Sequence, residues 1–309
     1  MITIQEYLLS KKIAEEIKER TIKATDYTIK KIIDKELLEN GPEANLNHID
    51  TSAVTDMKEL FYDYKDFNGD VSDWDVSQVK SMSKMFCGCT DFNCDLHAWK
   101  LDNLINAAKM FSGCENFNSD ISEWKMPKLF NAENMFNFCK NFDQDLSKWD
   151  LSKVVYISGM FAYCSKLNHN VGNFNFYNAT SIQGMFTGCT AFDQDVSNMM
   201  NGKKKINMSA TFKECINFTG KGLETWNVSS IHIAAQAFKK CESLKADISN
   251  WVLDDLTNAE SMFEGCKSLT CNCSHWKLNK HLFYFKENTK KMFYNSGIKM
   301  AFRPTIYSL

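Results

Sequence analysis

One position in this chain is occupied by cysteine at an almost constant interval. Eight of the 12 cysteines follow one another at spacings of 25 or 26 residues: Cys89, Cys114, Cys139, Cys164, Cys189, Cys215, Cys241 and Cys266. A phenylalanine stands three residues before each of them. Self-similarity at a fixed period of about 20–50 residues indicates a repeat architecture, in which each unit packs only against its neighbours. The 309 residues are therefore predicted to form one elongated array rather than two compact domains.

Tryptophan marks a second position of the same repeat. Every tryptophan lies ten or eleven residues after the cysteine position: Trp74, Trp99, Trp124, Trp149, Trp226, Trp251 and Trp276. Tyr64 and Ser296 replace the cysteine in the first and last units, and Phe174 and Met199 replace the tryptophan in two others. Because large aromatic side chains and free cysteines are mostly buried, both columns are predicted to lie in the core.

Two patterns of apolar residues alternate within one unit. From Leu101 to Cys114 the apolar positions fall every three or four residues, which predicts one or two helical or 3₁₀ turns. Between Phe92 and Leu101, the spacing of Trp99 and Leu101 predicts a short strand. One strand, a turn and a short helical stretch in ~25 residues are typical of leucine-rich repeats. The sequence therefore predicts an α/β repeat solenoid, a curved leucine-rich-repeat-like array of about ten such units.

The clearest unit, Met135–Asp150, reads Met-Phe-x-x-Cys-x-x-Phe-Asp-x-Asp-Leu-Ser-x-Trp-Asp. In spacing and residue type this string resembles the BspA-like leucine-rich-repeat family, which includes the 25-residue repeats of mycoplasmal surface lipoproteins. The resemblance covers residues 45 to about 276. It implies the solenoid fold, and it implies a binding or adhesion role at a surface.

The two ends of the chain depart from the repeat, as the ends of solenoids do. Residues 1–44 are predicted to be a helical N-terminal cap, and Thr3 and Glu6 in it have the spacing of a capping box. An apolar helical stripe follows and stops before a Gly-Pro pair: Ile29, Ile32, Ile33 and Leu37, then Gly41-Pro42. Residues 45–280 form the predicted solenoid, and residues 281–309 a basic C-terminal cap.

Charge is unevenly distributed along the chain. Residues 45–276 carry 21 Lys and Arg against 28 Asp and Glu, a net charge of −7. Residues 277–309 carry 7 Lys and Arg against 1 Glu, a net charge of +6. A broadly basic face for nucleic acid is therefore not expected over the middle of the array.

The sequence also bears on location. No apolar run reaches the ~18–20 residues of a membrane span. The start of the chain, Met1–Glu6, lacks the basic and apolar parts of a signal peptide. We expect a cytoplasmic protein that is monomeric when free. A cell-surface or secreted protein exported by a non-classical route is the alternative.

Two columns of side chains allow a metal-binding interpretation, and in both a structural role is favoured. The repeat cysteines are interpreted as reduced, small apolar side chains that fill the turn between strand and helix. An acidic column is interpreted as a set of turn caps, because the Gly-Gly-x-Gly-x-Asp signature of calcium-binding β-rolls is absent: Asp70, Asp95, Asp120, Asp145, Asp195 and Asp247.

Four cysteines lie outside the repeat position: Cys87, Cys94, Cys271 and Cys273. With His97 and His275 they supply the residue types that bind zinc, but the spacing C-x-C-x₄-C-x₂-H is not a common zinc pattern. The sequence therefore predicts no metal and no cofactor, and it leaves open a metal or redox role for these four thiols.

Catalysis has no sequence motif to support it. The six histidines share no pattern with a nucleophile. The sequence contains no G-x-S-x-G, P-loop, H-E-x-x-H or dinucleotide-binding fingerprint. The protein is predicted not to be an enzyme.

The residues on either side of the tryptophan position differ from unit to unit. A constant core beneath a varied exposed row is what a protein-binding face requires, although a solvated face without a partner would look the same. The candidate binding residues of this row are Asp73, Asp75, Lys100, Glu123, Lys125, Lys148, Asp150, Asn175 and Lys277. The basic C-terminal cap adds Lys286, Lys290, Lys291, Lys299 and Arg303.

The leading hypothesis is a non-enzymatic solenoid that binds a protein inside the cell, as an inhibitor or effector. One alternative is a surface adhesion protein without its export signal. The other is a nucleic-acid binder that uses the basic C-terminal cap and Lys203-Lys204-Lys205.

Overall fold

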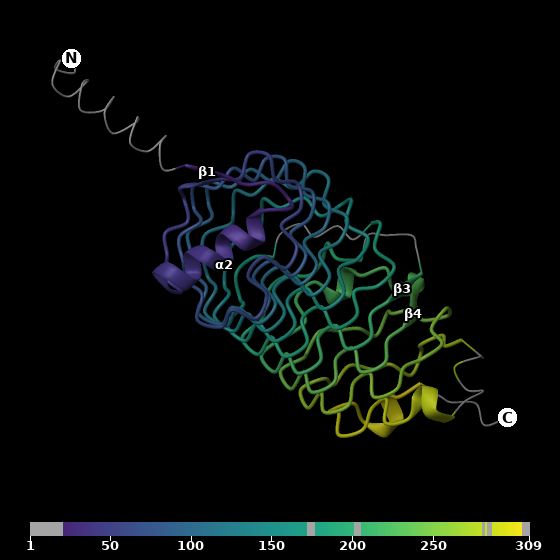
Figure 1. Cartoon of the computed structure of the whole chain (residues 1–309). Helices are drawn as coiled ribbons and strands as arrows, with labels where there is room; N and C mark the ends of the chain where they lie inside the picture. Colours follow the sequence, from purple (N-terminus) through teal and green to yellow (C-terminus); the bar gives the residue numbers. More distant parts are fainter. Residues whose placement is uncertain (1–20, 172–176, 201–204, 280–281, 283–285, 305–309) are drawn as a thin grey trace, which may run out of the picture.

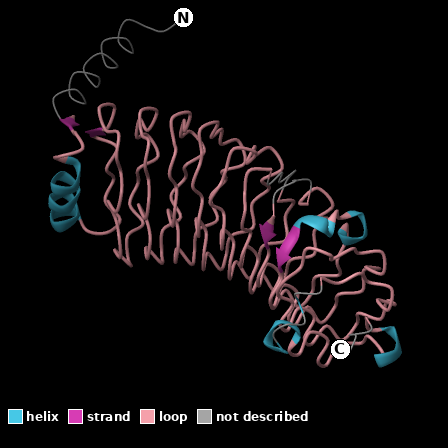
Figure 2. Ribbon diagram, turned by 90° about the vertical axis from the view of Figure 1, so that its right-hand side faces the viewer, coloured by secondary structure: helices cyan, strands magenta, loops and turns pink. Residues whose placement is uncertain are grey.

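The computed structural model describes residues 21–171, 177–200, 205–279, 282 and 286–304. The chain winds into one elongated coil whose successive turns of ~25 residues lie side by side (Figures 1 and 2). We call each turn of the coil a rung. The predicted capping box at Thr3 and Glu6, the candidate Asn175, the Trp-position residue Phe174 and the pair Lys203-Lys204 lie outside the described residues.

Regular secondary structure is sparse in this coil, as the predominance of loops in Figure 2 shows. The helix α2 spans Ile29–Asn40, and the short strands pair in parallel, β1 (Ile22–Lys23) with β2 (Ile49–Asp50) and β3 (Ile206–Asn207) with β4 (Ile231–Ile233). The described residues also include the 3₁₀ segments η1 Leu223–Thr225, η2 Val228–Ser230, η4 Lys286–Thr289 and η5 Met300–Phe302. None of the helices in the described part of the chain is long and apolar enough to cross a bilayer.

The parallel pairing between rungs lies in a segment that the sequence predicted to be helical. We call it the ladder segment: the nine residues that end at the repeat cysteine, such as Asn106–Cys114. Isolated parallel bridges join its first residue to the next rung, as between Asn106 and Asn131. Alternate N–H groups then donate to carbonyl oxygens of that rung at 2.7–2.9 Å: Ala107 to Asn131, Lys109 to Glu133, Phe111 to Met135 and Gly113 to Asn137.

The remaining N–H groups of the ladder segment close tight turns. Three successive bonds reach back three residues: Met110 to Ala107, Ser112 to Lys109 and Cys114 to Phe111. Lys109 and Gly113 have φ angles of 57° and 81°, the left-handed conformation that the third residue of a type II turn adopts. The predicted helical turns are thus wrong. The apolar spacing of three that suggested them arises from overlapping turns, each closed by a bond that reaches back three residues, which do not continue as a helix.

The predicted strand around the tryptophan is also wrong. Between Phe92 and Leu101 the chain forms a turn, and the backbone N–H of Trp99 donates to the carbonyl oxygen of Leu96 at 3.2 Å. The alternation of Trp99 and Leu101 reflects two buried positions on either side of a corner. The leucine-rich-repeat-like solenoid is therefore built from corners and ladder segments rather than from a strand and a helix.

The predicted core columns are confirmed. The phenylalanine rings three residues before the cysteines stack from rung to rung with centroids 5.2–5.8 Å apart, from Phe61 to Phe293. The tryptophans form two stacks, one from Trp99 to Trp149 and one from Trp226 to Trp276, with 6.2 Å between the rings of Trp124 and Trp149. Both columns are buried, and stacked aromatic pairs add to the hydrophobic free energy of burial. The core is one continuous column along the coil.

Helix α2 covers the first rung of the coil (Figure 1). Its buried face carries Ile29 and Ile33. In this rung Tyr64 replaces the repeat cysteine, and its hydroxyl donates to Oδ1 of Asp34 at 2.6 Å and accepts from Nζ of Lys30 at 2.7 Å. In the first unit, Tyr64 thus takes the position of the buried thiol and holds helix α2 in place.

Candidate binding surface

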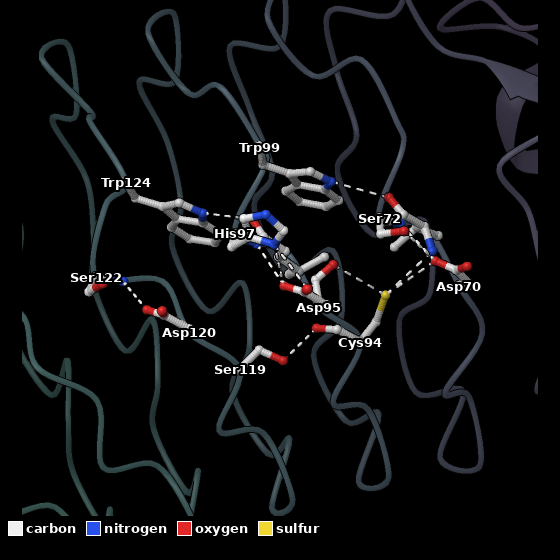
Figure 3. Close-up of polar contacts among 12 residues, drawn as sticks. Asp70, Ser72, Cys94, Asp95, His97, Trp99, Ser119, Asp120, Ser122 and Trp124 are labelled. Atoms are coloured by element: carbon white, nitrogen blue, oxygen red, sulfur yellow. Dashed lines mark hydrogen bonds and ion pairs between the residues drawn. The ribbon is translucent and has the colours of Figure 1, made fainter. Parts of the chain in front are cut away.

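Two hydrogen bonds fix the corner at each tryptophan. The backbone N–H closes the turn, and the indole N–H donates to the preceding rung, as Figure 3 shows for Trp99 and Trp124. The indole Nε1 of Trp99 donates to the carbonyl oxygen of Val71 in the preceding rung at 3.2 Å, and that of Trp124 to Leu96 at 3.0 Å. All seven tryptophans make such a bond to the preceding rung. The neighbours of each tryptophan therefore point outward from a rigid corner.

We call the exposed residues that flank the tryptophan position the corner row. All of its predicted members within the described residues are exposed: Asp73, Asp75, Lys100, Glu123, Lys125, Lys148, Asp150 and Lys277. They are brought onto one edge of the coil by the stacking of the tryptophans between them. Within the described residues, corners on successive rungs thus present a line of different side chains.

Some members of the corner row have structural partners. Lys148 forms an ion pair with Glu123 of the preceding rung, so these two charges offset each other. Asp75 and Asp150 accept hydrogen bonds from the backbone N–H groups of Ser77 and Ser152. Within the described residues, the side chains of the other four have no such partner: Asp73, Lys100, Lys125 and Lys277. These four are available to a ligand without loss of an internal contact.

The acidic column caps turns, as predicted. The Oδ1 atom of Asp95 accepts the backbone N–H of His97 at 3.0 Å, and that of Asp120 accepts the N–H of Ser122 at 2.9 Å (Figure 3). These backbone hydrogen bonds hold the pKa of both carboxyl groups below the usual value, because they stabilise the ionised form. The same bond recurs along the column, so these carboxylates belong to the fold.

A second polar column links neighbouring rungs. The side-chain oxygen of Asn93 accepts the backbone N–H of Asn118 at 2.7 Å, and that of Asn118 accepts the N–H of Asp143 at 2.9 Å. The series continues through Asn168 to Asp193. In a flat sheet, a backbone carbonyl oxygen would accept the N–H group of the neighbouring strand. Here a side-chain amide or carboxylate oxygen accepts it instead.

The repeat cysteines do more than fill space. The thiol of each of the eight donates a hydrogen bond of 2.9–3.1 Å to the carbonyl oxygen of the repeat phenylalanine in the preceding rung, as from Cys114 to Phe86. Burial raises the pKa of Cys89 and of Cys266 to about 12. The predicted core position is confirmed, and the hydrogen bond is an addition that the sequence did not predict.

The cysteines outside the repeat position behave differently from one another. Burial raises the pKa of Cys94 to about 11. The sulfur atoms of Cys271 and Cys273 lie 3.6 Å apart, and the hydrogen bond from the Cys273 thiol lowers the pKa of Cys271 to about 7. Among the described residues, no three or more His, Cys, Asp or Glu side chains converge on a common point where a metal ion could bind.

The basic C-terminal cap is less uniform than the sequence suggests. Lys290 pairs with Glu287 at 2.9 Å, and the ammonium groups of Lys291 and Lys299 lie over the rings of Tyr294 and Phe302. Lys286 is exposed at the start of η4.

Arg303 has a structural role within this cap. Its side chain is half-buried, and its guanidinium donates to the carbonyl oxygens of Phe293 and Ile298 at 3.2–3.3 Å. Of the five predicted basic candidates, Arg303 therefore helps to hold the end of the coil, whereas the four lysines are exposed.

Sequence reasoning missed a set of exposed aromatic residues on the ladder segments or directly before them: Phe130, Phe138, Tyr156 and Tyr163. A signal for two of them was present. Phe138 and Tyr163 stand directly before the repeat cysteine, a position that elsewhere holds mostly glycine or a polar residue. Such a position tolerates aromatic residues poorly when the turn requires a positive φ.

Comparisons with known proteins agree with the repeat. A family model described as "Mycoplasma protein of unknown function, DUF285" matches three successive stretches, residues 35–141, 120–221 and 200–301. Among solved structures, the chain is similar to a leucine-rich repeat protein from Eubacterium ventriosum, with 13% sequence identity, 84% of each chain covered and a TM-score of 0.33. No curated protein matches the chain.

The three family matches overlap and together cover most of the coil. They confirm the resemblance to bacterial repeat proteins with mycoplasmal members that the 25-residue unit indicated. The chain belongs to the DUF285 family of Mycoplasma proteins.

Proposed function

We propose that this protein is a non-enzymatic binding solenoid whose partner is a protein and whose corner row makes the contact. In its more specific form, the proposal is that binding takes place inside the cell and masks an active surface of the partner, as an inhibitor or effector would. The relation to leucine-rich repeat proteins supports a binding module in general terms.

One observation carries the proposal: at each corner, the tryptophan holds the fold while the residues beside it face the solvent. Trp99 is buried and hydrogen-bonded to the preceding rung, whereas Lys100 beside it is exposed. A corner-row side chain can therefore change without altering the coil. Specificity in protein recognition depends on such side chains.

The polar columns support a non-enzymatic role. Asp95 and Asp120 are engaged by backbone N–H groups of their own turns, and the repeat thiols donate to backbone carbonyl oxygens. Side chains that satisfy the fold in this way are not free to act as general bases or nucleophiles, which must reach a substrate atom.

The test is a charge-reversed corner row: Asp73→Lys with Lys100→Glu, Lys125→Glu and Lys277→Glu. These four residues have no internal partner in the described structure, so the variant is expected to fold. Immobilised wild type is expected to capture a partner protein from a lysate of the source organism, and the variant to capture at least about ten-fold less of it. Cross-linking mass spectrometry would locate the contact on the corner row.

The matched control reverses Lys65 and Lys166, exposed lysines in the loop after the cysteine position and away from the corner. This variant is expected to capture the partner as wild type does. Equal capture by the corner-row variant and wild type would contradict the proposal, as would an equal loss in the control. The inhibitor form further requires that the partner's own activity falls when one equivalent of wild type is added.

A further inference from the structure

A groove crosses the ladder segments in the middle of the coil. Two adjacent rungs supply most of its lining, with Ser158, Gly159 and Ala162 in one, and Gln183, Gly184 and Thr187 in the next. Larger side chains border it, with Glu133 and Asn134 on one side and Lys213 on the other. The volume is about 480 Å³, within the range of small-molecule sites. At a rung spacing of ~4.8 Å, four rungs give a length of ~14 Å.

An aromatic wall, Phe138 and Tyr163, borders this groove, and Tyr163 is the member that lines it. The rings of Phe138 and Tyr163 stack with centroids 4.4 Å apart and planes 10° from parallel. Their exposed fractions are 43% and 38%, unlike the buried phenylalanine columns. Tyr163 lies over Gly188 of the next rung, where an added Cβ would approach its ring to 2.6 Å. Glycine at that position therefore makes room for the wall.

Both aromatic residues are held in a conformation that bulky side chains avoid. Their φ angles are 61° and 63°, and the same position also has a positive φ where it holds glycine, as at Gly113 and Gly188, or a polar residue, as at Glu214. Inter-rung hydrogen bonds from their N–H groups fix the backbone, from Phe138 to Ala162 at 2.8 Å and from Tyr163 to Thr187 at 2.6 Å. Positive φ at this position is a property of the repeat, and these two rungs differ from the others in carrying there a bulky aromatic side chain, which this conformation disfavours.

The lining of the groove selects for an uncharged ligand. Hydroxyl and amide groups from Asn134, Ser158 and Gln183 can both donate and accept hydrogen bonds. The only charged side chains are Glu133 and Lys213, which stand on opposite borders. A phosphate chain would need a cluster of cations, which is not present among these residues.

The backbone that lines the groove argues against an added peptide strand. The N–H groups of Gly159 and Gly184 already donate to the carbonyl oxygens of Gln183 and Ser209 in the following rungs. Strand addition requires unpaired backbone groups at a sheet edge. A ligand in this groove must instead bind side chains and the aromatic wall.

We propose that the groove binds a neutral oligosaccharide. A sugar ring offers an apolar face of C–H groups and an edge of hydroxyls, which match an exposed aromatic ring beside amide and hydroxyl side chains. In this arrangement a sugar ring stacks on Tyr163, and its hydroxyls bind Asn134, Ser158 and Gln183. The site is separate from the corner row and does not depend on the protein-binding role.

The test uses an array of neutral and acidic glycans, followed by calorimetric titration of the hits with the full chain. We expect binding to one or more neutral oligosaccharides and no preference for acidic ones. In the next rung the same turn position holds Gly188. The variant Tyr163→Gly is therefore expected to keep the fold and to relieve the strain of the turn. Affinity is expected to fall about ten-fold or more, while the unfolding midpoint stays level or rises.

The control is Tyr62→Ala, which removes another exposed aromatic side chain (49% exposed, against 38% for Tyr163) from a rung outside the groove. This variant is expected to bind as wild type does. Absence of binding to every neutral glycan at millimolar concentration would overturn the proposal. So would preferential binding of an acidic glycan or a peptide, or neutral-glycan binding that Tyr163→Gly leaves unchanged.

Discussion

The thiol of Cys139 donates a hydrogen bond of 3.0 Å to the carbonyl oxygen of Phe111, which lies in the preceding rung. That carbonyl oxygen also accepts the backbone N–H of Cys114 at 2.9 Å, so both of its lone pairs are used. The bond recurs at each of the eight repeat cysteines. A small side chain with a donor is therefore what this buried position requires.

The first prediction distinguishes the contribution of the thiol hydrogen bond to stability from that of sulfur packing. Cys139→Ala removes the donor and leaves a small cavity, and we expect the free energy of unfolding to fall by ~1–2 kcal/mol. Cys139→Ser keeps a donor in nearly the same place and should cost less. Urea unfolding of the two variants beside wild type measures the difference. If serine destabilises as much as alanine, packing of the sulfur atom alone selects cysteine.

The second prediction concerns Cys271. Its pKa of about 7, lowered by the Cys273 thiol, gives mostly thiolate at pH 8, whereas Cys94 with a pKa of about 11 is protonated. Because the thiolate reacts, the alkylation rate of Cys271 by iodoacetamide should rise with pH through a midpoint near 7 and level off about one unit above it. Cys273→Ala should move that rise to higher pH. Peptide mass spectrometry after timed alkylation gives the rate at each site.

The repeat cysteines supply the internal control for this experiment. Their burial and raised pKa values predict that they react only after unfolding in denaturant. Cys94→Ala should leave the fast phase unchanged. A fast phase that survives Cys271→Ala, or a rate whose midpoint lies near 9, would contradict the prediction.

The sequence predicted the positions of the core but not the path of the chain between them. Phe86, Cys89 and Trp99 are buried as expected, because burial follows from side-chain type and from repetition. The ladder segment was predicted to be helical because apolar spacings of three and four fit both a helix and overlapping turns. What distinguishes the two is the left-handed conformation of residues such as Lys84 and Lys109, and lysine has no marked preference for it.

The candidate surface was predictable to a similar extent. The exposure of Lys100 and Lys125 follows from the buried tryptophans beside them. By contrast, the pairing of Lys148 with Glu123 and the bonds of Arg303 depend on how neighbouring rungs align, which one unit of sequence does not specify. The stacking of Phe138 on Tyr163 could not be predicted for the same reason, because it depends on how the two rungs align.

The third prediction follows from the acidic column. Backbone N–H donors lower the pKa of Asp120 and Asp145 in the folded chain, relative to ~3.9 when unfolded. A depressed folded-state pKa contributes stability that is present above the unfolded value and lost as pH falls through the folded value. The urea midpoint should therefore be level near neutral pH and fall below about pH 4.

Asp120→Asn tests this assignment, because the amide oxygen can still cap Ser122 but does not ionise. The difference in urea midpoint between wild type and this variant should shrink as pH falls from about 5 to about 2.5. A difference that is constant across this range would show that Asp120 does not contribute to the acid sensitivity.

The fourth prediction concerns the tryptophan column. Trp124 stacks between Trp99 and Trp149 and donates to the carbonyl oxygen of Leu96. Trp124→Ala should lower the free energy of unfolding by ~3–5 kcal/mol through cavity formation. Trp276→Ala should cost less, because the neighbouring C-terminal cap departs from the regular repeat and can relax. Urea unfolding followed by circular dichroism compares the two, and an unchanged midpoint for Trp124→Ala would contradict the stacked-core interpretation.

The last prediction concerns the basic C-terminal cap and rests on the proposed protein partner. The net charge of −7 on residues 45–276 and +6 on residues 277–309 makes the coil dipolar along its length, and such fields steer association more than they add affinity. A triple reversal to Glu should use the three exposed lysines of the cap that form no ion pair within the described residues: Lys286, Lys291 and Lys299.

Lys290 and Arg303 are left intact in this variant, because the first is paired with Glu287 and the second holds backbone carbonyl oxygens of the cap. Association with the partner should slow several-fold at low salt. The difference should be small near 1 M, where the screening length is ~3 Å. Lys65→Glu with Lys166→Glu, a reversal outside the cap, serves as the control and should slow association less. Stopped-flow association rates across a salt series measure the effect, and identical rates for wild type and the triple variant at every salt concentration would limit the basic residues to a structural role at the end of the coil.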